Sequence, residues 1–177
     1  MMLNAKECME LIQTRHSVRH YTDRPIARED LEQIAEAAIY APSAMNRQSW
    51  QFTVLTNREK IGELAEAIRI CLGRDAYDMY RPTALIIASN ERDNRNGPED
   101  CACALQNMFL MAHALGIGSV WINQLKGICD EPEIRKILRT LEIPENHLVW
   151  GMAALGYTAG HPRITEKNRD VIRFPDV

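Results

Sequence analysis

A short basic segment near the start of the chain has the residue types that bind an anion. Residues 15–19 read Arg-His-Ser-Val-Arg, so two guanidinium groups flank one hydroxyl within five positions. Guanidinium groups bind phosphate oxygens through paired N–H donors, and a hydroxyl adds a further donor. The alternative is that Arg15 and Arg19 form surface ion pairs with Asp23 or Glu29. Two arginines around a hydroxyl favour the anion site.

A second polar segment, residues 41–51, reads Ala-Pro-Ser-Ala-Met-Asn-Arg-Gln-Ser-Trp-Gln. Its proline stops the preceding helical pattern, and its amides and hydroxyls suit the polar edge of a flat heterocycle. A turn in which Ser43 and Asn46 bond their own backbone would use the same residues, and both interpretations can hold together. A pocket that is basic at one end and amide-lined at the other suits flavin mononucleotide (FMN).

The spacing of apolar residues predicts the elements that position these two segments. Helical spacing indicates five helices, over residues 4–14, 28–40, 57–72, 98–115 and 131–138. Apolar runs indicate four strands, over residues 50–56, 83–89, 116–122 and 148–155. Because long helices separate the strands irregularly, we expect an α+β fold with a central sheet sandwiched by helices. We expect residues 1–177 to form a single domain.

The composition excludes several classes of protein. Apolar residues make up 46% of the chain and charged residues 25%, as in an ordinary soluble globular protein. A net charge of -3 gives no general attraction to nucleic acid or to anionic membranes. The longest apolar runs, 84–88 and 108–112, are too short to span a bilayer. Charged residues stand where a signal peptide needs an apolar core, so we expect a cytoplasmic protein without nucleic-acid or membrane partners.

The chain lacks the common motifs of hydrolytic, nucleotide-domain and metal enzymes. Its five cysteines have irregular spacing without a Cys-x-x-Cys pair, and its five histidines have no metal-ligand spacing. It has no Gly-x-Gly-x-x-Gly between a strand and a helix, no P-loop, no Gly-x-Ser-x-Gly and no His-Glu-x-x-His. We therefore expect no metal site, and expect a bound cofactor rather than a side chain to carry any chemistry.

Four motifs, in this order along the chain, resemble the FMN-dependent nitroreductase family. They are Arg15-x-Ser17-x-Arg19, Ala41-Pro42-Ser43-x-x-Asn46-x-Gln48-x-Trp50, Leu115-Gly116-Ile117-Gly118-x-x-Trp121-Ile122 and Leu155-Gly156-Tyr157. The resemblance covers nearly the whole chain. It implies a mostly antiparallel sheet and a homodimer with shared active sites.

The resemblance also implies which residues bind FMN. The basic segment would hold the phosphate and ribityl chain, through Arg15, His16, Ser17 and Arg19. The second segment would reach the flavin from the other subunit, through Pro42, Ser43, Ala44, Asn46 and Gln48. Backbone N–H groups after the glycine-started strand would face flavin N5, at Trp121, Ile122, Asn123 and Gln124.

The third and fourth motifs leave two questions open. Many relatives have an acidic residue followed by glycine where this chain has Asn123-Gln124, so we expect differences in redox potential and substrate access. Gly156 belongs to the fourth motif, and the cations Arg163, Lys167 and Arg169 follow it. The resemblance implies that one of these cations reaches the phosphate, and the sequence does not select it.

The implied function is hydride transfer from NAD(P)H through flavin N5 to a nitro compound, quinone or similar small molecule, by a ping-pong mechanism. The protein would supply position, electrostatics and a shaped cavity. Two alternatives remain: a specialised flavin enzyme, for dehalogenation or flavin breakdown, or a flavin-binding module without useful turnover. Residues 71–82 include Tyr77, Tyr80 and Arg81, which would either gate a substrate or pack against the site.

Overall fold

The computed structural model describes residues 4–160 and 166–175, which adopt an α+β fold. Its four-stranded sheet has the order β1-β2-β4-β3, and every neighbouring pair is antiparallel. The strands are β1 (Trp50–Leu55), β2 (Ala84–Glu91), β3 (Gly118–Ile122) and β4 (His147–Gly156). Strands β1 and β3 therefore form opposite edges of the sheet.

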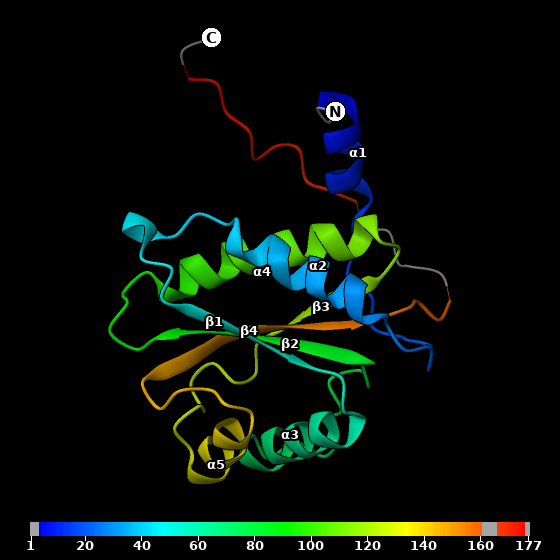
Figure 1. Cartoon of the computed structure of the whole chain (residues 1–177). Coiled ribbons are helices and arrows are strands. Elements are labelled where there is room, and N and C mark those ends of the chain that lie inside the picture. The colour runs from blue at the N-terminus through cyan, green and yellow to red at the C-terminus, as the bar shows by residue number, and fades with distance from the viewer. Residues whose placement is uncertain (1–3, 161–165, 176–177) are drawn as a thin grey trace.

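Helices cover both faces of the sheet, as the sequence predicts (Figure 1). One face carries α2 (Arg28–Ile39) and α4 (Gly97–Ala114), and the other carries α3 (Arg58–Cys71) and α5 (Pro132–Thr140). Helix α1 (Ala5–Thr14) stands at the end of the α2–α4 layer, and none of its residues is buried.

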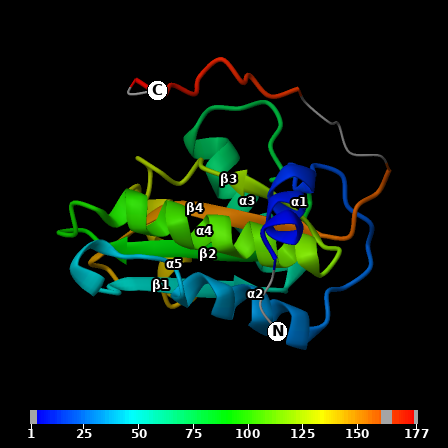
Figure 2. The ribbon, with the colours of Figure 1, turned by 90° about the horizontal axis from the view of Figure 1, so that it is seen from above.

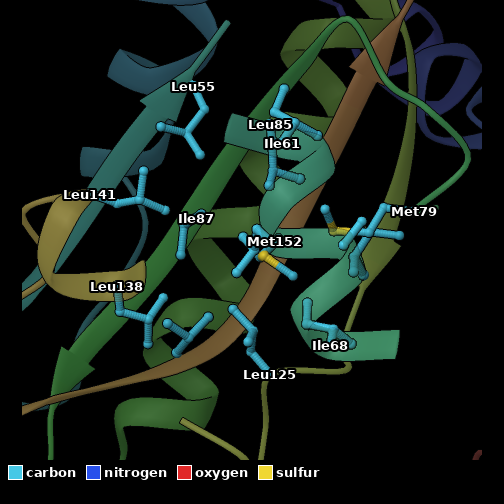
Figure 3. Packing of buried hydrophobic residues seen from close by; sticks show 14 of the residues in the cluster. Leu55, Ile61, Ile68, Met79, Leu85, Ile87, Leu125, Leu138, Leu141 and Met152 are labelled. Atoms are coloured by element: carbon cyan, nitrogen blue, oxygen red, sulfur yellow. The ribbon is translucent and has the colours of Figure 1, made fainter. Parts of the chain in front are cut away.

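The position of strand β2 between two helix layers explains why its sequence is almost continuously apolar. Ile86 and Ala88 pack in the cluster beneath α2 and α4, whereas Leu85 and Ile87 pack in the cluster against α3 and α5 (Figure 3). Successive side chains of a strand point to opposite faces, so a strand between two helix layers needs apolar residues throughout. Each fully buried Leu or Ile contributes about 1.5–3 kcal/mol to stability.

Side-chain caps set two of the helix starts. The Asn4 side chain accepts the Glu7 N–H at 2.9 Å and the Glu7 carboxylate accepts the Asn4 N–H at 3.1 Å, which together form a capping box. The Asn57 side chain likewise accepts N–H groups at the start of α3. The nine predicted elements all form, with ends that differ by a few residues.

Two of these differences have a clear physical cause. Strand β2 continues to Glu91, beyond its predicted end at residue 89, because Ser89 and Asn90 are buried and hydrogen-bonded. The Asn90 Oδ1 accepts the Ser49 hydroxyl at 2.8 Å, which satisfies a polar group inside the sheet. Strand β3 begins at Gly118 rather than at Gly116, because Gly116 adopts a φ of 72° after the end of α4.

Candidate functional site

The basic segment lies along the open edge of β3. Ser17 forms a parallel bridge with Ser119, and the Val18 N–H donates to the Ser119 carbonyl at 2.9 Å. Alternate residues of an extended segment point to opposite sides, so Val18 is buried while Ser17 and Arg19 are exposed. Gly118 permits this approach, since a Cβ there would lie 2.8 Å from Val18 Cγ2.

The two arginines of this segment do not form the surface ion pairs considered from the sequence. Asp23 instead pairs with Arg58, with Arg58 Nη1 2.6 Å from Asp23 Oδ1. Among residues 4–160 and 166–175, neither Arg15 nor Arg19 has a carboxylate within ion-pairing distance. Two cations without carboxylate partners beside an exposed hydroxyl have the donor chemistry of a phosphate site, so these residues fit the anionic end of FMN.

His16 connects the basic segment to α1 through a hydrogen bond and to α4 through a ring contact. Its Nδ1 donates to the Thr14 carbonyl at 2.8 Å, and its ring lies edge-on to His113 with 6.0 Å between centroids. The Thr14 hydroxyl donates to Glu10, so His113 Nε2 must donate to Thr14 Oγ1 at 2.8 Å. Burial, together with His16 and Arg15 nearby, lowers the pKa of His113. The contact of His16 with FMN stays a prediction.

A pocket lies further along the same sheet edge. It encloses about 320 Å³ and is lined by Trp121, Ile122, Gln124 and residues of the 74–80 segment. Because Ser17 bridges Ser119 in parallel, the basic segment runs from Arg15 toward this pocket. The Arg19 guanidinium carbon lies 5.8 Å from the ring centre of Tyr80, which lines the pocket. The basic segment and three of the four positions expected to face flavin N5 therefore share one edge, with Arg19 at the pocket end of the segment.

The segment that covers this pocket has a strained backbone. Met79, Tyr80 and Arg81 are consecutive and have φ values of 52°, 65° and 51°, a left-handed conformation that residues other than glycine rarely adopt. Met79 is buried in the α3–α5 core (Figure 3), which anchors the turn. Tyr80 then lies beside the basic segment, with its ring centre 5.8 Å from the Arg19 guanidinium carbon. Strained turns of this kind concentrate at functional sites.

Within one chain, the 42–48 loop lies far from the basic segment and the β3 edge (Figures 1 and 2). The Ala44 N–H donates to Asp100 in the first turn of α4, whereas His16 contacts His113 in the last turn. Thirteen helical residues separate these two anchors, or about 20 Å. The loop leads into β1, and three strand spacings, about 14 Å, separate β1 from β3. One chain therefore does not bring the loop to the β3 edge.

The loop itself is a turn whose polar side chains bond locally; Ser43 bonds the backbone as predicted, whereas Asn46 bonds the Gln48 side chain instead. It includes the short 3₁₀ helix Ala44–Asn46. The Gln48 amide donates to Asn46 Oδ1 at 2.9 Å, and the Gln48 N–H donates to the Ser43 hydroxyl at 3.2 Å. Asp100, which holds the loop, was not recognised from the sequence. An acid in the first turn of a helix is common there, and nothing local indicates a partner so distant in sequence.

The other predicted residues have more limited structural roles. Gly156 is buried, and a Cβ there would lie 2.7 Å from the Tyr21 ring, so this glycine makes room for Tyr21. Lys167 and Arg169 are exposed and line a hollow formed by residues 166–170 alone. Arg163 lies outside the described residues. The contacts of these residues with FMN stay predictions.

Within residues 4–160 and 166–175, no helix has the length and apolar character needed to cross a membrane. No group of three or more His, Cys, Asp or Glu side chains in the same residues is arranged to hold a metal ion.

Comparison with known proteins places this geometry in a family. The model of the Nitroreductase family matches residues 12–157. A protein of Archaeoglobus fulgidus, provisionally named NADH dehydrogenase/NAD(P)H nitroreductase, is 38% identical over 158 residues, covering 86% of each chain. The FMN reductase [NAD(P)H] of Bacillus subtilis is 28% identical, over 88% of this chain and 66% of its own.

Solved structures agree with these sequence matches. The crystal structure of a nitroreductase with bound FMN from Bacteroides fragilis has a TM-score of 0.93 and 39% identity, covering 96% of this chain and 99% of its own. A nitroreductase with bound FMN from Desulfitobacterium hafniense has a TM-score of 0.88 and 25% identity, covering 99% of this chain and 100% of its own. The chain therefore belongs to the nitroreductase family, a family of oxidoreductases.

Proposed function

We propose that this protein binds FMN along the β3 edge and uses it to transfer hydride from NAD(P)H to a nitro compound, quinone or similar acceptor. The proposal rests on one observation: Arg15 and Arg19, which have no carboxylate partner among the described residues, lie on the same strand edge as a pocket. The FMN of the two similar crystal structures supports the same cofactor here. When bound, FMN supplies the hydride-accepting N5.

The chain's own groups orient the cofactor and exclude water. Arg15, Ser17 and Arg19 bind the phosphate end, and the edge of β3 supports the rest of the molecule. After β3, the Asn123 N–H already donates to Gln124 Oε1 at 3.0 Å, whereas the Gln124 N–H has no acceptor within the described parts of the chain. The Gln124 N–H is therefore our candidate donor to flavin N5. Electron donor and acceptor occupy the pocket in turn, which gives ping-pong kinetics.

We further propose that the active unit is a homodimer in which each site uses both chains. The 42–48 loop and the basic segment are attached to opposite ends of α4, so a second copy must supply the loop if both contact one flavin. Apolar residues that a monomer would leave in water support this assembly: Met45 is 86% exposed, Phe174 is 71% exposed and Met9 in α1 is 53% exposed. Obligate homodimers cover such residues in interfaces above about 2,000 Å².

Spectroscopy of the purified protein, followed by steady-state kinetics, tests the proposal. We expect a yellow protein that releases FMN rather than FAD on denaturation, and that oxidises NADH or NADPH when a nitro compound or quinone is present. A colourless protein that also fails to quench the fluorescence of added FMN would contradict the cofactor assignment. FMN binding without turnover of any acceptor would favour a flavin-binding module.

A further inference from the structure

The side-chain amide of Gln124 is held in one orientation at the pocket. Its Oε1 accepts the Asn123 N–H at 3.0 Å and the Tyr77 hydroxyl at 2.9 Å. A backbone N–H can only donate, so the oxygen and not the NH₂ group must face it. The Nε2 group is therefore directed away from both partners. Within residues 4–160 and 166–175 it has no hydrogen-bond acceptor, so it is a fixed donor available to a ligand.

Tyr77 is the residue that completes this orientation. Burial raises the pKa of Tyr77, so its hydroxyl remains protonated and remains a donor. The Arg74 guanidinium carbon lies 5.1 Å from the centre of the Tyr77 ring and restricts the ring further. Tyr77 comes from the segment before β2 and Gln124 from the end of β3, so their hydrogen bond also ties the covering segment to the pocket edge.

The pocket that Gln124 borders has the size and lining for a small aromatic molecule. Its volume of about 320 Å³ is at the lower end for small-molecule sites, which favours a single ring over a polycyclic ligand. The side chains of Tyr77, Tyr80 and Trp121 give it flat aromatic walls. The neutral Nε2 donor of Gln124 can form a hydrogen bond with an oxygen of the ligand. It does not favour binding of a positively charged group.

We infer that the Gln124 Nε2 group donates to an oxygen of the electron acceptor, and that Tyr77 is a positioning residue for that amide. The selected acceptors are single-ring nitro compounds and quinones, whose oxygens accept hydrogen bonds. This inference rests on the proposed function, because the pocket is taken to adjoin the flavin.

Binding of unreactive acceptor analogues to the FMN-loaded protein tests the inference without turnover. Benzoate has the shape of nitrobenzene and acetophenone carries one neutral carbonyl, and their binding is followed through the absorbance of bound FMN. Gln124→Met removes the donor and keeps the length of the side chain. Gln124→Glu keeps an oxygen for Asn123 and Tyr77 but lacks the Nε2 donor. Gln33→Glu, on the exposed face of α2, is the matched control.

We expect Gln124→Met to weaken benzoate binding about 10-fold or more, the effect of losing a hydrogen bond to a charged group. Gln124→Glu should also weaken the binding of acetophenone, which is neutral and is therefore not repelled by the new carboxylate. Gln33→Glu should leave the affinity for both ligands unchanged. Tyr77→Phe should weaken benzoate binding by a smaller factor and have no further effect in the Gln124→Met background. In turnover, the KM for a nitro acceptor should rise with little change in kcat.

The outcomes separate this inference from the function on which it rests. Retained FMN shows that a variant is folded and keeps its cofactor site. If FMN-loaded Gln124→Met and Gln124→Glu bind both analogues as tightly as the parent, the inference is wrong and the proposed function stands. If the parent itself binds no FMN, the proposed function is wrong and the inference falls with it.

Discussion

The N–H of Ala44 donates a 2.9 Å hydrogen bond to Oδ1 of Asp100, across 56 positions of sequence. Asp100 is buried, and its other oxygen accepts the Asn94 amide at 2.9 Å. It also lies in the first turn of α4, where free N–H groups and the helix dipole stabilise a carboxylate. One buried side chain thus fixes the loop that we expect to reach the partner's flavin.

Replacing Asp100 with Asn should release this loop. The substitution preserves size but removes the charge and puts an NH₂ group against one of two donors, so we expect a loss of about 1–3 kcal/mol in the free energy of unfolding. FMN affinity should fall as well. Urea denaturation and FMN titration measure the two effects. Asp93→Asn, an exposed neighbour in the preceding loop, is the control; equal results for both variants would contradict this role of Asp100.

Replacing Arg15 or Arg19 with Ala should weaken FMN binding by about 1.5–3 kcal/mol each, the range for a hydrogen bond to a charged group. Lys should restore only part of the affinity, because a point charge lacks the paired donors of guanidinium. Fluorescence titration with FMN measures the change. Arg28→Ala is the control, since Arg28 is exposed and paired with Glu32 on α2. An unchanged affinity in the Arg15→Ala, Arg19→Ala double variant would remove both from the site.

Two glycines should respond to alanine in opposite directions. At Gly156 a Cβ would meet the Tyr21 ring at 2.7 Å, and Tyr21 is held by its hydroxyl bonds to the Val18 and Ala154 carbonyls. We expect Gly156→Ala to destabilise the protein by about 1–3 kcal/mol. At Gly62, within α3, a Cβ meets nothing within 4 Å, so Gly62→Ala should stabilise by up to about 1 kcal/mol. Thermal denaturation of both variants measures the two effects. If both substitutions change the melting temperature in the same direction, the prediction is wrong.

The buried Arg135 makes stability depend on Asp130 in a defined pH range. Hydrogen bonds from Arg92 and then Arg135 hold the pKa of Asp130 far below its usual value. The ionised carboxylate therefore stabilises the fold above the unfolded-state pKa of about 3.9, and this contribution declines as the pH falls below that value.

Asp130→Asn should lower the free energy of unfolding at pH 7 by about 1–2 kcal/mol, less than for a fully buried pair because solvent screens the carboxylate. The Asp130 side chain is 58% exposed, and that of Arg135 is 6% exposed. Urea denaturation at several pH values should show this difference shrinking below about pH 4. A difference that stays constant down to pH 2 would contradict the assignment to Asp130. Asp170→Asn, in the exposed C-terminal segment, is the control.

Hydrophobic spacing was sufficient to predict the elements of this fold, because every one of the nine predicted helices and strands except α1 buries apolar residues of its own. The strand at residues 84–91 is recognisable since both of its faces enter a core, and the helix at 97–114 since its apolar residues recur at helical spacing. Element ends were less predictable. Asn90 is polar by type but lies inside the sheet, where Ser49 and Asn94 both donate to its side-chain oxygen.

The residue types of the candidate site could be predicted from the sequence. The contacts between residues that are distant in the sequence could not. Arg15 and Arg19 could be identified because their chemistry is local to five residues. The link between Tyr77 and Gln124 could not, because it joins side chains 47 positions apart. The left-handed backbone of residues 79–81 could not be predicted either, because none of these residues is a glycine. The separation of the 42–48 loop from the basic segment likewise depends on strand order.

The shared site is the central claim, and mixing two damaged variants tests it most directly. Arg15→Ala and Asn46→Ala should each lose FMN when purified alone. After joint unfolding and refolding in equal amounts, random pairing makes about half of the dimers mixed, each with one intact and one doubly damaged site. We therefore expect FMN binding to return to about a quarter of all sites. If mixed dimers demonstrably form and bind no FMN, both residues serve the flavin of their own chain, and the shared-site account is wrong.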